Sequence, residues 1–332
     1  MTRIFSGVKP TGHLTLGNYL GAVRQWVAAD QAPEDALFCV VDLHALTIEH
    51  DPARVRRLSR EAATLLLAAG LSPEKCTLFV QSHVDEHTRL AYLLECTATD
   101  GELRRMIQYK EKAATAQAAG AGVRLSLLTY PVLMAADILA YDTDEVPVGE
   151  DQRQHVELTR DLAVRFNQRY GPTFAVPKVT LPAVAARVMD LQDPTSKMGK
   201  SGDAGAGVVF MLDEPGVVRK KVMRAVTDSG DGGVVYDRAA RPGAANLLDV
   251  LGACTGADPA VLAEGYGGYG ALKRDVADAV VELLRPVRER HAELAADPGA
   301  VEKVLRAGAE RARGLARPVV DRAYRAIGLL ER

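Results

Sequence analysis

LFCVVDL, residues 37–43, is apolar at every position until Asp42 interrupts the run. An unbroken apolar run of this length is typical of a strand that is buried on both faces, as in parallel sheets covered by helices on each side. Such strands present polar groups at their carboxyl ends, where open α/β sheets bind their ligands. We therefore expect a ligand to bind near Asp42.

The segments on either side of this strand continue an alternation of strands and helices. RIFSGV (3–8) and TLFVQS (77–82) have the composition of strands. Between the second and third of these strands, PARVRRLSREAATLLLAAG (52–70) has the pattern of an amphipathic crossover helix. This order predicts an α/β fold with a parallel sheet.

The C-terminal third of the chain has a different pattern. After the Gly-rich SKMGKSGDAGAG (196–207), strand-like segments give way to helical patterns at 214–226, 245–253 and 270–292. We predict a boundary near residue 205, which divides the chain into 1–205 and a smaller α-helical domain, 206–332. The Ala- and Arg-rich tail, 301–332, is predicted to be a solvated helix.

Composition limits the possible partners and the compartment. With 41 Lys and Arg against 43 Asp and Glu, the formal net charge is −2, so nucleic-acid contacts must come from a local basic patch. The four cysteines are far apart, which argues against a zinc site and a disulfide scaffold and favours a reducing cytoplasm. No apolar run approaches the roughly 18 residues of a membrane span. We expect a soluble cytosolic protein without a membrane partner.

Two glycine-containing loops are candidate anion sites. The first strand ends at Ser6 and Gly7, and a turn at 10–12 and Gly17 precede an amphipathic helix predicted from about 18 to 29. Glycine lets a phosphate approach the main chain, and the following helix adds its positive dipole end. The spacing matches neither a Walker loop nor a dinucleotide fingerprint, and an ordinary βα turn is an equal alternative.

The second loop is DPTSKMGKS (193–201), in which Lys197 and Lys200 lie three residues apart between two serines. Two mobile ammonium groups suit a polyphosphate whose charge moves from one oxygen to another during a reaction. For an isolated loop of this composition, a solvated interdomain linker is the alternative.

Together the two loops resemble the signatures of class I aminoacyl-tRNA synthetases, in TGHLTLGNY (11–19) and KMGKS (197–201). More specifically, the chain resembles the bacterial tryptophanyl-tRNA synthetases in IFSGVKPTGHLTLGNYLGA (4–22), CVVDLHALT (39–47) and LLTYPVLMAADILAYDTDEVPVGEDQRQHVELTRDLAVRFN (127–167). The resemblance implies that tryptophan and ATP·Mg²⁺ form tryptophanyl-adenylate and pyrophosphate, and that the acyl group then passes to tRNA(Trp). It also implies a Rossmann-type catalytic domain at 1–205, a helical domain on the anticodon side, and a homodimer that binds tRNA across both subunits.

The resemblance assigns the nucleotide site residue by residue. Lys197, Lys200, Thr15 and Asn18 are implied to act in catalysis, with Mg²⁺ carried by ATP and no metal held by the protein. The ATP contacts that it implies are Lys9, Pro10, Thr11, Gly17, Asn18, Gly149, Glu150, Asp151, Val188, Lys197, Met198, Gly199, Lys200 and Ser201.

Asp137 carries the argument for the amino acid. It is the only charged residue in YPVLMAADILAY (130–141), and an ionised carboxylate among apolar neighbours is costly unless it meets a donor such as an indole N–H. A carboxylate that caps an amide or reaches solvent is the alternative. The other residues that the resemblance places around tryptophan are Phe5, Tyr130, Met134, Val146, Val148, Gln152 and His44, and core packing is the alternative for each apolar one.

Other functions and roles remain open from the sequence. A nucleotidylyltransferase such as pantothenate synthetase would bind ATP in the same way. A non-catalytic paralogue and a tyrosyl-tRNA synthetase are further alternatives. Arg104, Arg105, Lys110 and Lys112 form either a surface for the tRNA acceptor stem or a solvated helix face. His13 is expected to be structural or exposed, without a catalytic role.

Two positions depart from the family pattern. Most relatives have Gln at the position of Lys9 and Ser at the position of Gly199. An ammonium cannot accept a hydrogen bond, whereas the Gln amide can both donate and accept. Natural tryptophan offers a carboxylate that Lys9 still attracts, so an uncharged mimic should lose more affinity than tryptophan. We therefore expect an auxiliary form that tolerates tryptophan-mimicking inhibitors such as indole antibiotics.

Overall fold

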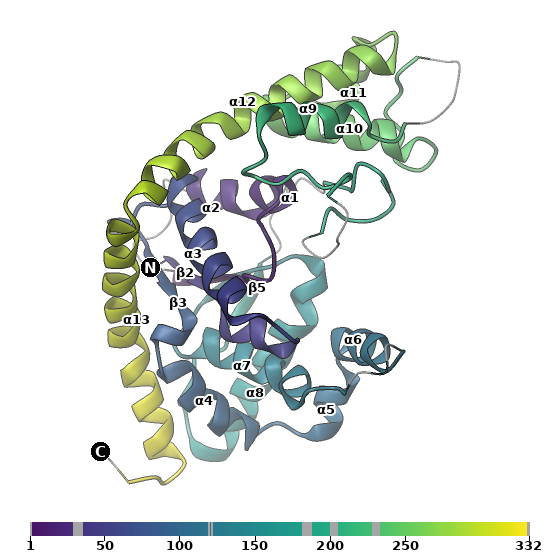
Figure 1. Cartoon of the computed structure of the whole chain (residues 1–332). Coiled ribbons are helices and arrows are strands. Elements are labelled where there is room, and N and C mark those ends of the chain that lie inside the picture. Colours follow the sequence, from purple (N-terminus) through teal and green to yellow (C-terminus); the bar gives the residue numbers. More distant parts are fainter. Residues whose placement is uncertain are drawn as a thin grey trace.

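A five-stranded parallel sheet forms the centre of the protein (Figure 1). The computed structural model describes residues 2–28, 36–118, 120, 122–180, 188–199, 205–227 and 233–330. The strands are β1 (Ile4–Val8), β2 (Ala36–Val40), β3 (Thr77–Val80), β4 (Glu145–Pro147) and β5 (Lys178–Thr180), in the order β3-β2-β1-β4-β5. In the centre of the sheet Phe38 is in register with Ser6 on one side and with Leu78 on the other. The predicted α/β fold with a parallel sheet is confirmed.

The central strand β2 is buried along its whole length, as its apolar run predicts. Phe38 and Val40 pack with helix α3 (Pro52–Ala68) on one face, whereas Leu37 and Cys39 pack with α4 (Glu86–Glu95), α7 (Leu125–Leu139) and α8 (Arg153–Tyr170) on the other. Successive side chains of a strand point to opposite faces, so an unbroken apolar run serves both cores.

The strands β2 and β3 end earlier than the sequence predicts. The chain leaves β2 after Val40 and forms the 3-10 helix η2 (Leu43–Thr47), and β3 is followed by η3 (Gln81–His83). Asp42 joins the two strand ends, because its carboxylate accepts hydrogen bonds from the Ser82 backbone N–H at 2.9 Å and from the Ser82 hydroxyl at 2.5 Å. Polar side chains therefore gather at this edge of the sheet.

The helix after β1 begins two residues before the predicted start. It consists of α1 (Leu16–Asn18), a π-helical turn η1 (Tyr19–Val23) and α2 (Arg24–Ala28). Thr15 is its N-cap, and the side chains of Thr15 and Asn18 form a capping box in which each accepts the other's backbone N–H. This cap fixes the loop between β1 and the helix.

The remaining helices follow the predicted pattern. A short helical region consists of α5 (Asp100–Arg105) and α6 (Ile107–Ala118), and the 3-10 helix η4 (Glu150–Gln152) follows β4. The C-terminal part contains α9 (Pro215–Met223), α10 (Pro242–Thr255), α11 (Pro259–Glu264), α12 (Tyr269–Ala296) and α13 (Pro298–Ala326). The helices predicted at 52–70, 214–226, 245–253 and 270–292 are thus all present. Among the described residues, no helix has the length and apolarity that a membrane crossing needs.

The prediction that the tail is a solvated helix is wrong for one face of α13. This helix runs along the edge strand β3 (Figure 1) and buries Leu305, Ala309 and Ala312. The approach is so close that a Cβ added to Gly308 would lie 1.8 Å from the backbone oxygen of Leu78. The buried face combines alanines with Val301, Leu305, Val319 and Val320, and an amphipathic pattern of this kind does not by itself show what the apolar face packs against.

Candidate active site

A cavity of about 440 Å³ opens at the carboxyl ends of β1 and β2 and beside β4. It is lined by all eight side chains that the sequence assigned to an amino-acid pocket: Phe5, His44, Tyr130, Met134, Asp137, Val146, Val148 and Gln152. Lys9, Asn18 and Gly149 from the predicted nucleotide site line the same cavity. The structure thus brings residues from distant parts of the chain together at the edge where parallel sheets bind ligands.

Asp137 forms the polar floor of this cavity and is 1% exposed. Its Oδ2 lies 2.7 Å from Nε2 of His44, and its Oδ1 lies 2.6 Å from Nδ1 of His87. The side-chain amide of Gln81 also donates to Oδ1, at 2.7 Å. Burial alone raises the pKa of Asp137, but His44 and His87 outweigh burial and hold the pKa well below its usual range. The carboxylate is therefore ionised and acts only as an acceptor.

The two oxygens of Asp137 are unequally occupied. Oδ1 has two donors, Gln81 and His87, whereas Oδ2 has only His44 among the residues that the structure describes. A carboxylate has about four lone-pair sites, two on each oxygen. Oδ2 therefore retains the capacity to accept one further hydrogen bond.

Tyr130 is held from behind the cavity by a residue that sequence reasoning missed. Its hydroxyl lies 2.7 Å from Nε2 of His155, which is 1% exposed. Burial, assisted by the charge of Lys112, lowers the pKa of His155 to about 4, so the imidazole is neutral at physiological pH. A lone histidine on an amphipathic helix gives no signal of its partner, because only the tertiary packing brings Tyr130 to it.

Lys112 was considered for a tRNA-facing surface, yet it also lines the cavity. Its ammonium lies 5.4 Å from the centre of the Tyr130 ring and 3.4 Å from the side-chain oxygen of Gln108. Lys9 enters the cavity from the end of β1 and donates to the Thr47 hydroxyl at 3.3 Å. Burial and the charge of Lys112 lower the pKa of Lys9 to about 8. The cavity thus contains two ammonium groups, a favourable arrangement for anionic ligands.

The two loops predicted to bind ATP lie against each other. A Cβ added to Gly17 would lie 3.5 Å from the backbone oxygen of Met198. The backbone N–H of Met198 donates to the oxygen of Val188 at 3.1 Å, and both side chains are buried. Pro10 is buried, Thr11 is half-buried, and Thr15 is fully buried in its capping box with Asn18.

The polar groups near the mouth of the site are exposed. Lys197 Nζ lies 3.9 Å from Oδ1 of Asp151, which joins the lysine loop to η4. Glu150, Asp151 and Gly199 are exposed. Lys200 and Ser201 lie outside the described residues.

The other sequence candidates lie elsewhere. His13 is exposed, as predicted, and its Nδ1 lies 2.6 Å from a carboxylate oxygen of Glu61. Arg104 is exposed and donates to Asp100 at 2.8 Å, and Arg105 and Lys110 are exposed on the same helical region.

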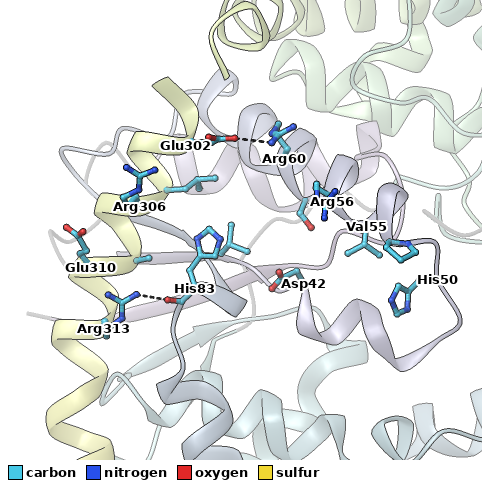
Figure 2. Close-up of a pocket in the computed structure, with 15 residues that line it drawn as sticks. Asp42, His50, Val55, Arg56, Arg60, His83, Glu302, Arg306, Glu310 and Arg313 are labelled. Atoms are coloured by element: carbon cyan, nitrogen blue, oxygen red, sulfur yellow. Dashed lines mark hydrogen bonds and ion pairs between the residues drawn. The ribbon is translucent and has the colours of Figure 1, made fainter. Parts of the chain in front are cut away.

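A second hollow, of about 720 Å³, lies between α3 and α13 (Figure 2). Arg60 from α3 pairs with Glu302 from α13 at 2.9 Å across it, and Arg313 donates to the backbone oxygen of His83 at 2.8 Å. Guanidinium groups and carboxylates alternate along this groove. Its alternating charges contrast with the first cavity, where one buried carboxylate and two ammonium groups lie among apolar and aromatic walls.

A parallel α/β sheet has two glycine-containing loops and an aromatic cavity at its carboxyl edge. This arrangement is typical of enzymes that bind a nucleotide together with a small organic substrate. Residues 1–285 match the family described as tRNA synthetases class I (W and Y). Tryptophan–tRNA ligase 1 of Streptomyces avermitilis is 76% identical over 331 residues, covering 100% of both chains. Tryptophan–tRNA ligase 2 of the same organism is 51% identical, covering 99% of this chain and 97% of its own length.

The fold agrees with these similarities. The crystal structure of tryptophanyl-tRNA synthetase from Campylobacter jejuni complexed with ADP and tryptophan superimposes with a TM-score of 0.84 at 31% identity, covering 99% of this chain and 100% of that chain. The chain belongs to the bacterial tryptophanyl-tRNA synthetases, within the class I family for tryptophan and tyrosine.

Proposed function

We propose that the cavity over Asp137 is the tryptophan site, and that the adjoining loops form the ATP site, of a tryptophan–tRNA ligase (EC 6.1.1.2). Membership of the family gives the chain this ligase activity, in which tryptophan is activated with ATP and transferred to tRNA(Trp). The proposal concerns which residues bind tryptophan and ATP.

The observation that carries the proposal is the buried, ionised carboxylate of Asp137 at the floor of an aromatic cavity. Oδ2 can accept one more hydrogen bond, and the indole N–H of tryptophan is a donor on an otherwise apolar ring. Phe5, Met134 and Val146 supply apolar walls around this acceptor. A site built around one specific hydrogen bond rejects amino acids that lack the donor by large factors.

We assign the polar end of tryptophan to Gln152 of η4, whereas Tyr130 of α7 contributes an aromatic wall and His44 of η2 contacts Oδ2 of Asp137. The relative from Campylobacter jejuni was crystallised with ADP and tryptophan, which agrees with adjoining sites for the two ligands. The ATP residues that we propose are Asn18, Gly149 and the loop at 197–201.

The first chemical step requires positioning and charge stabilisation rather than proton transfer, because the attacking carboxylate is already ionised at neutral pH. An oxygen of the tryptophan carboxylate forms a bond to the α-phosphorus of Mg²⁺·ATP, and the bond to the pyrophosphate oxygen breaks. The ammonium groups of Lys197 and Lys200 stabilise the negative charge that collects on the departing pyrophosphate. Lys9 and Lys112 add positive charge from inside the cavity. In the second step a ribose hydroxyl of tRNA(Trp) takes the acyl group and adenosine monophosphate leaves.

We further propose the functional division of the chain into 1–205, which carries catalysis, and 206–332, which serves the anticodon side of the tRNA. Arg105 and Lys110, exposed on α5 and α6, are candidates for contact with the acceptor stem. We also propose a cytoplasmic homodimer, as the resemblance to the family implies. Exposed apolar side chains on α4 and α7, Tyr92 and Leu125, are in keeping with an association surface.

The finer proposal is that the protein is an auxiliary, inhibitor-tolerant form. Lys9 replaces a neutral amide with an ammonium inside the substrate cavity, where it cannot accept a hydrogen bond while charged. Streptomyces avermitilis has two such ligases, and this chain is 76% identical to ligase 1 and 51% identical to ligase 2.

ATP–pyrophosphate exchange tests the proposed function. Purified protein with ATP and Mg²⁺ should exchange labelled pyrophosphate in the presence of tryptophan, without exchange in the presence of tyrosine or pantothenate and β-alanine. It should also charge tRNA(Trp). Exchange that depends equally on tyrosine, or no exchange with any amino acid, would contradict the proposal.

A further inference from the structure

The hydrogen bonds below Asp137 continue beyond the cavity to two fully buried residues. His87, on α4, contacts Oδ1 of Asp137 through Nδ1 at 2.6 Å and the Tyr141 hydroxyl through Nε2 at 2.7 Å. Both His87 and Tyr141 are 0% exposed and lie behind Asp137, away from the cavity wall. The chain of contacts therefore runs from the substrate site into the core between α4 and α7.

The chemistry of the groups from Asp137 through His87 to Tyr141 fixes the direction of each hydrogen bond between them. An ionised carboxylate only accepts, so Nδ1 of His87 carries a hydrogen and donates it to Asp137. In the neutral tautomer Nε2 of His87 then accepts the hydrogen of the Tyr141 hydroxyl. With Gln81 as the second donor, Oδ1 of Asp137 is saturated and the plane of the carboxylate is fixed. The remaining acceptor capacity lies on Oδ2, on the cavity side.

We propose that His87 is a positioning and specificity-determining residue for tryptophan, which keeps the carboxylate of Asp137 as a fixed acceptor for the indole N–H. This role rests on the proposed function. His87 does not touch the ligand but acts through Asp137. Without its hydrogen bond, a fully buried carboxyl group loses one of its donors and shifts towards the neutral acid, whose O–H competes with the indole N–H.

The surroundings of Asp137 favour this shift once His87 is removed. Burial acts to raise the pKa of Asp137, and the hydrogen bonds from His44 and His87 act to lower it. The groups near these hydrogen bonds include thiol, phenol and carboxyl groups, which are neutral or negative. The titratable groups facing Asp137, His87 and Tyr141 are Cys39 on β2, Asp42 after β2, His44 on η2 and Glu86 on α4. In the absence of His87, His44 is the only one of them that can favour the ionised form.

Two substitutions at His87 separate its hydrogen bond from its volume. In His87→Asn the side-chain amide nitrogen occupies roughly the place of Nδ1 and can still donate to Asp137. In His87→Leu the donor is lost and an apolar side chain fills the space. Leu90→Ala is the matched control, because Leu90 is a fully buried residue on the same helix and makes no hydrogen bond to Asp137. Tyr141→Phe is a second, milder variant, which removes only the hydroxyl that contacts His87.

The readouts are the KM values for tryptophan and ATP in pyrophosphate exchange between pH 6 and 8, and discrimination against β-(3-benzothienyl)-L-alanine, in which sulfur replaces the indole N–H. For His87→Leu we expect the tryptophan KM to rise roughly tenfold, as for loss of one charge-assisted hydrogen bond, with little change for ATP. The tryptophan KM should also rise as the pH falls, and discrimination against the sulfur analogue should decrease. His87→Asn should restore most of the wild-type behaviour.

The outcomes distinguish this role from the proposed function. Wild-type protein without tryptophan-dependent exchange would overturn the proposed function, and the role of His87 with it. With normal wild-type exchange, unchanged discrimination and a flat pH profile in His87→Leu would overturn the role of His87 alone. The same changes in Leu90→Ala would show a merely structural effect and would also overturn it. If His87→Leu does not fold, unchanged discrimination in Tyr141→Phe decides against the proposal.

Discussion

His44 and Asp137 form a buried pair at the floor of the cavity, with 2.7 Å between Nε2 of the imidazole and Oδ2 of the carboxylate. His44 comes from the turn after β2 and Asp137 from the apolar helix α7. This is the oxygen that we assign to the indole N–H, so His44 and the substrate share one acceptor. The pair connects the carboxyl end of β2, which is predicted to bind a ligand, with Asp137, which is predicted to recognise the amino acid.

Asp137→Asn should weaken tryptophan binding more than ATP binding. Asparagine has a similar shape but offers a neutral acceptor, and loss of a charge-assisted hydrogen bond costs about 1.5–3 kcal/mol. This corresponds to a rise in the tryptophan KM of roughly 10-fold to 150-fold. Steady-state pyrophosphate exchange measures both constants, and an unchanged tryptophan KM would refute the assignment of Asp137.

Lys9→Gln should make the protein more sensitive to uncharged indole inhibitors while the tryptophan KM changes little. Because the pKa of Lys9 is lowered to about 8, the ammonium loses its proton as the pH rises through this value, and the neutral amine can then accept a hydrogen bond. The ratio of the wild-type inhibition constant to that of Lys9→Gln should therefore fall between pH 7 and pH 9. Equal inhibition of the two proteins at pH 7 would make Lys9 an incidental substitution.

Lys197→Ala should lower kcat for adenylate formation with little effect on the tryptophan KM. The Lys197 ammonium lies at the exposed mouth of the site, 3.9 Å from Asp151, and is proposed to act on the departing pyrophosphate rather than on the amino acid. Loss of one preorganised group that stabilises transition-state charge typically costs roughly 100-fold in kcat. Single-turnover adenylate formation measures this step. A larger effect on the tryptophan KM than on kcat would place Lys197 in substrate binding instead.

His155 should make the protein less stable in acid. Its pKa is lowered from 6.5 to about 4 in the folded state, so the unfolded chain binds a proton first as the pH falls. The stabilisation is fully present above pH 6.5 and is lost as the pH falls towards 4, with a magnitude on the order of 3 kcal/mol. His155→Gln should flatten this part of the curve of unfolding free energy against pH, measured by urea denaturation. Parallel curves for the two proteins would contradict the assignment.

The sequence predicted the sheet and singled out Asp137 from local signals, whereas the other cavity residues were assigned through the resemblance to tryptophanyl-tRNA synthetases. The apolar run of β2 identifies a strand with two buried faces, and Asp137 is conspicuous as the only charge in an apolar helix. His87 and His155 have no comparable signal. Each is a single histidine on an amphipathic helix, and its partner comes from a different part of the chain.

The docking of α13 was missed for a related reason. Its amphipathic pattern indicates an apolar face but not the partner of that face, and the partner is β3, which α13 approaches closely at Gly308. Lys112 is exposed, as either expectation for it requires, but the sequence does not show that packing brings its ammonium within 5.4 Å of the centre of the Tyr130 ring. Contacts between elements thus account for what the sequence pattern does not reveal.

A crystal structure with bound L-tryptophan tests the central claim most directly. We expect the indole ring between Phe5, Met134 and Val146, with its nitrogen about 2.9 Å from Oδ2 of Asp137 and with the amino acid's polar end towards Gln152. An indole nitrogen without contact to Asp137, or a tryptophan bound outside this cavity, would contradict the account.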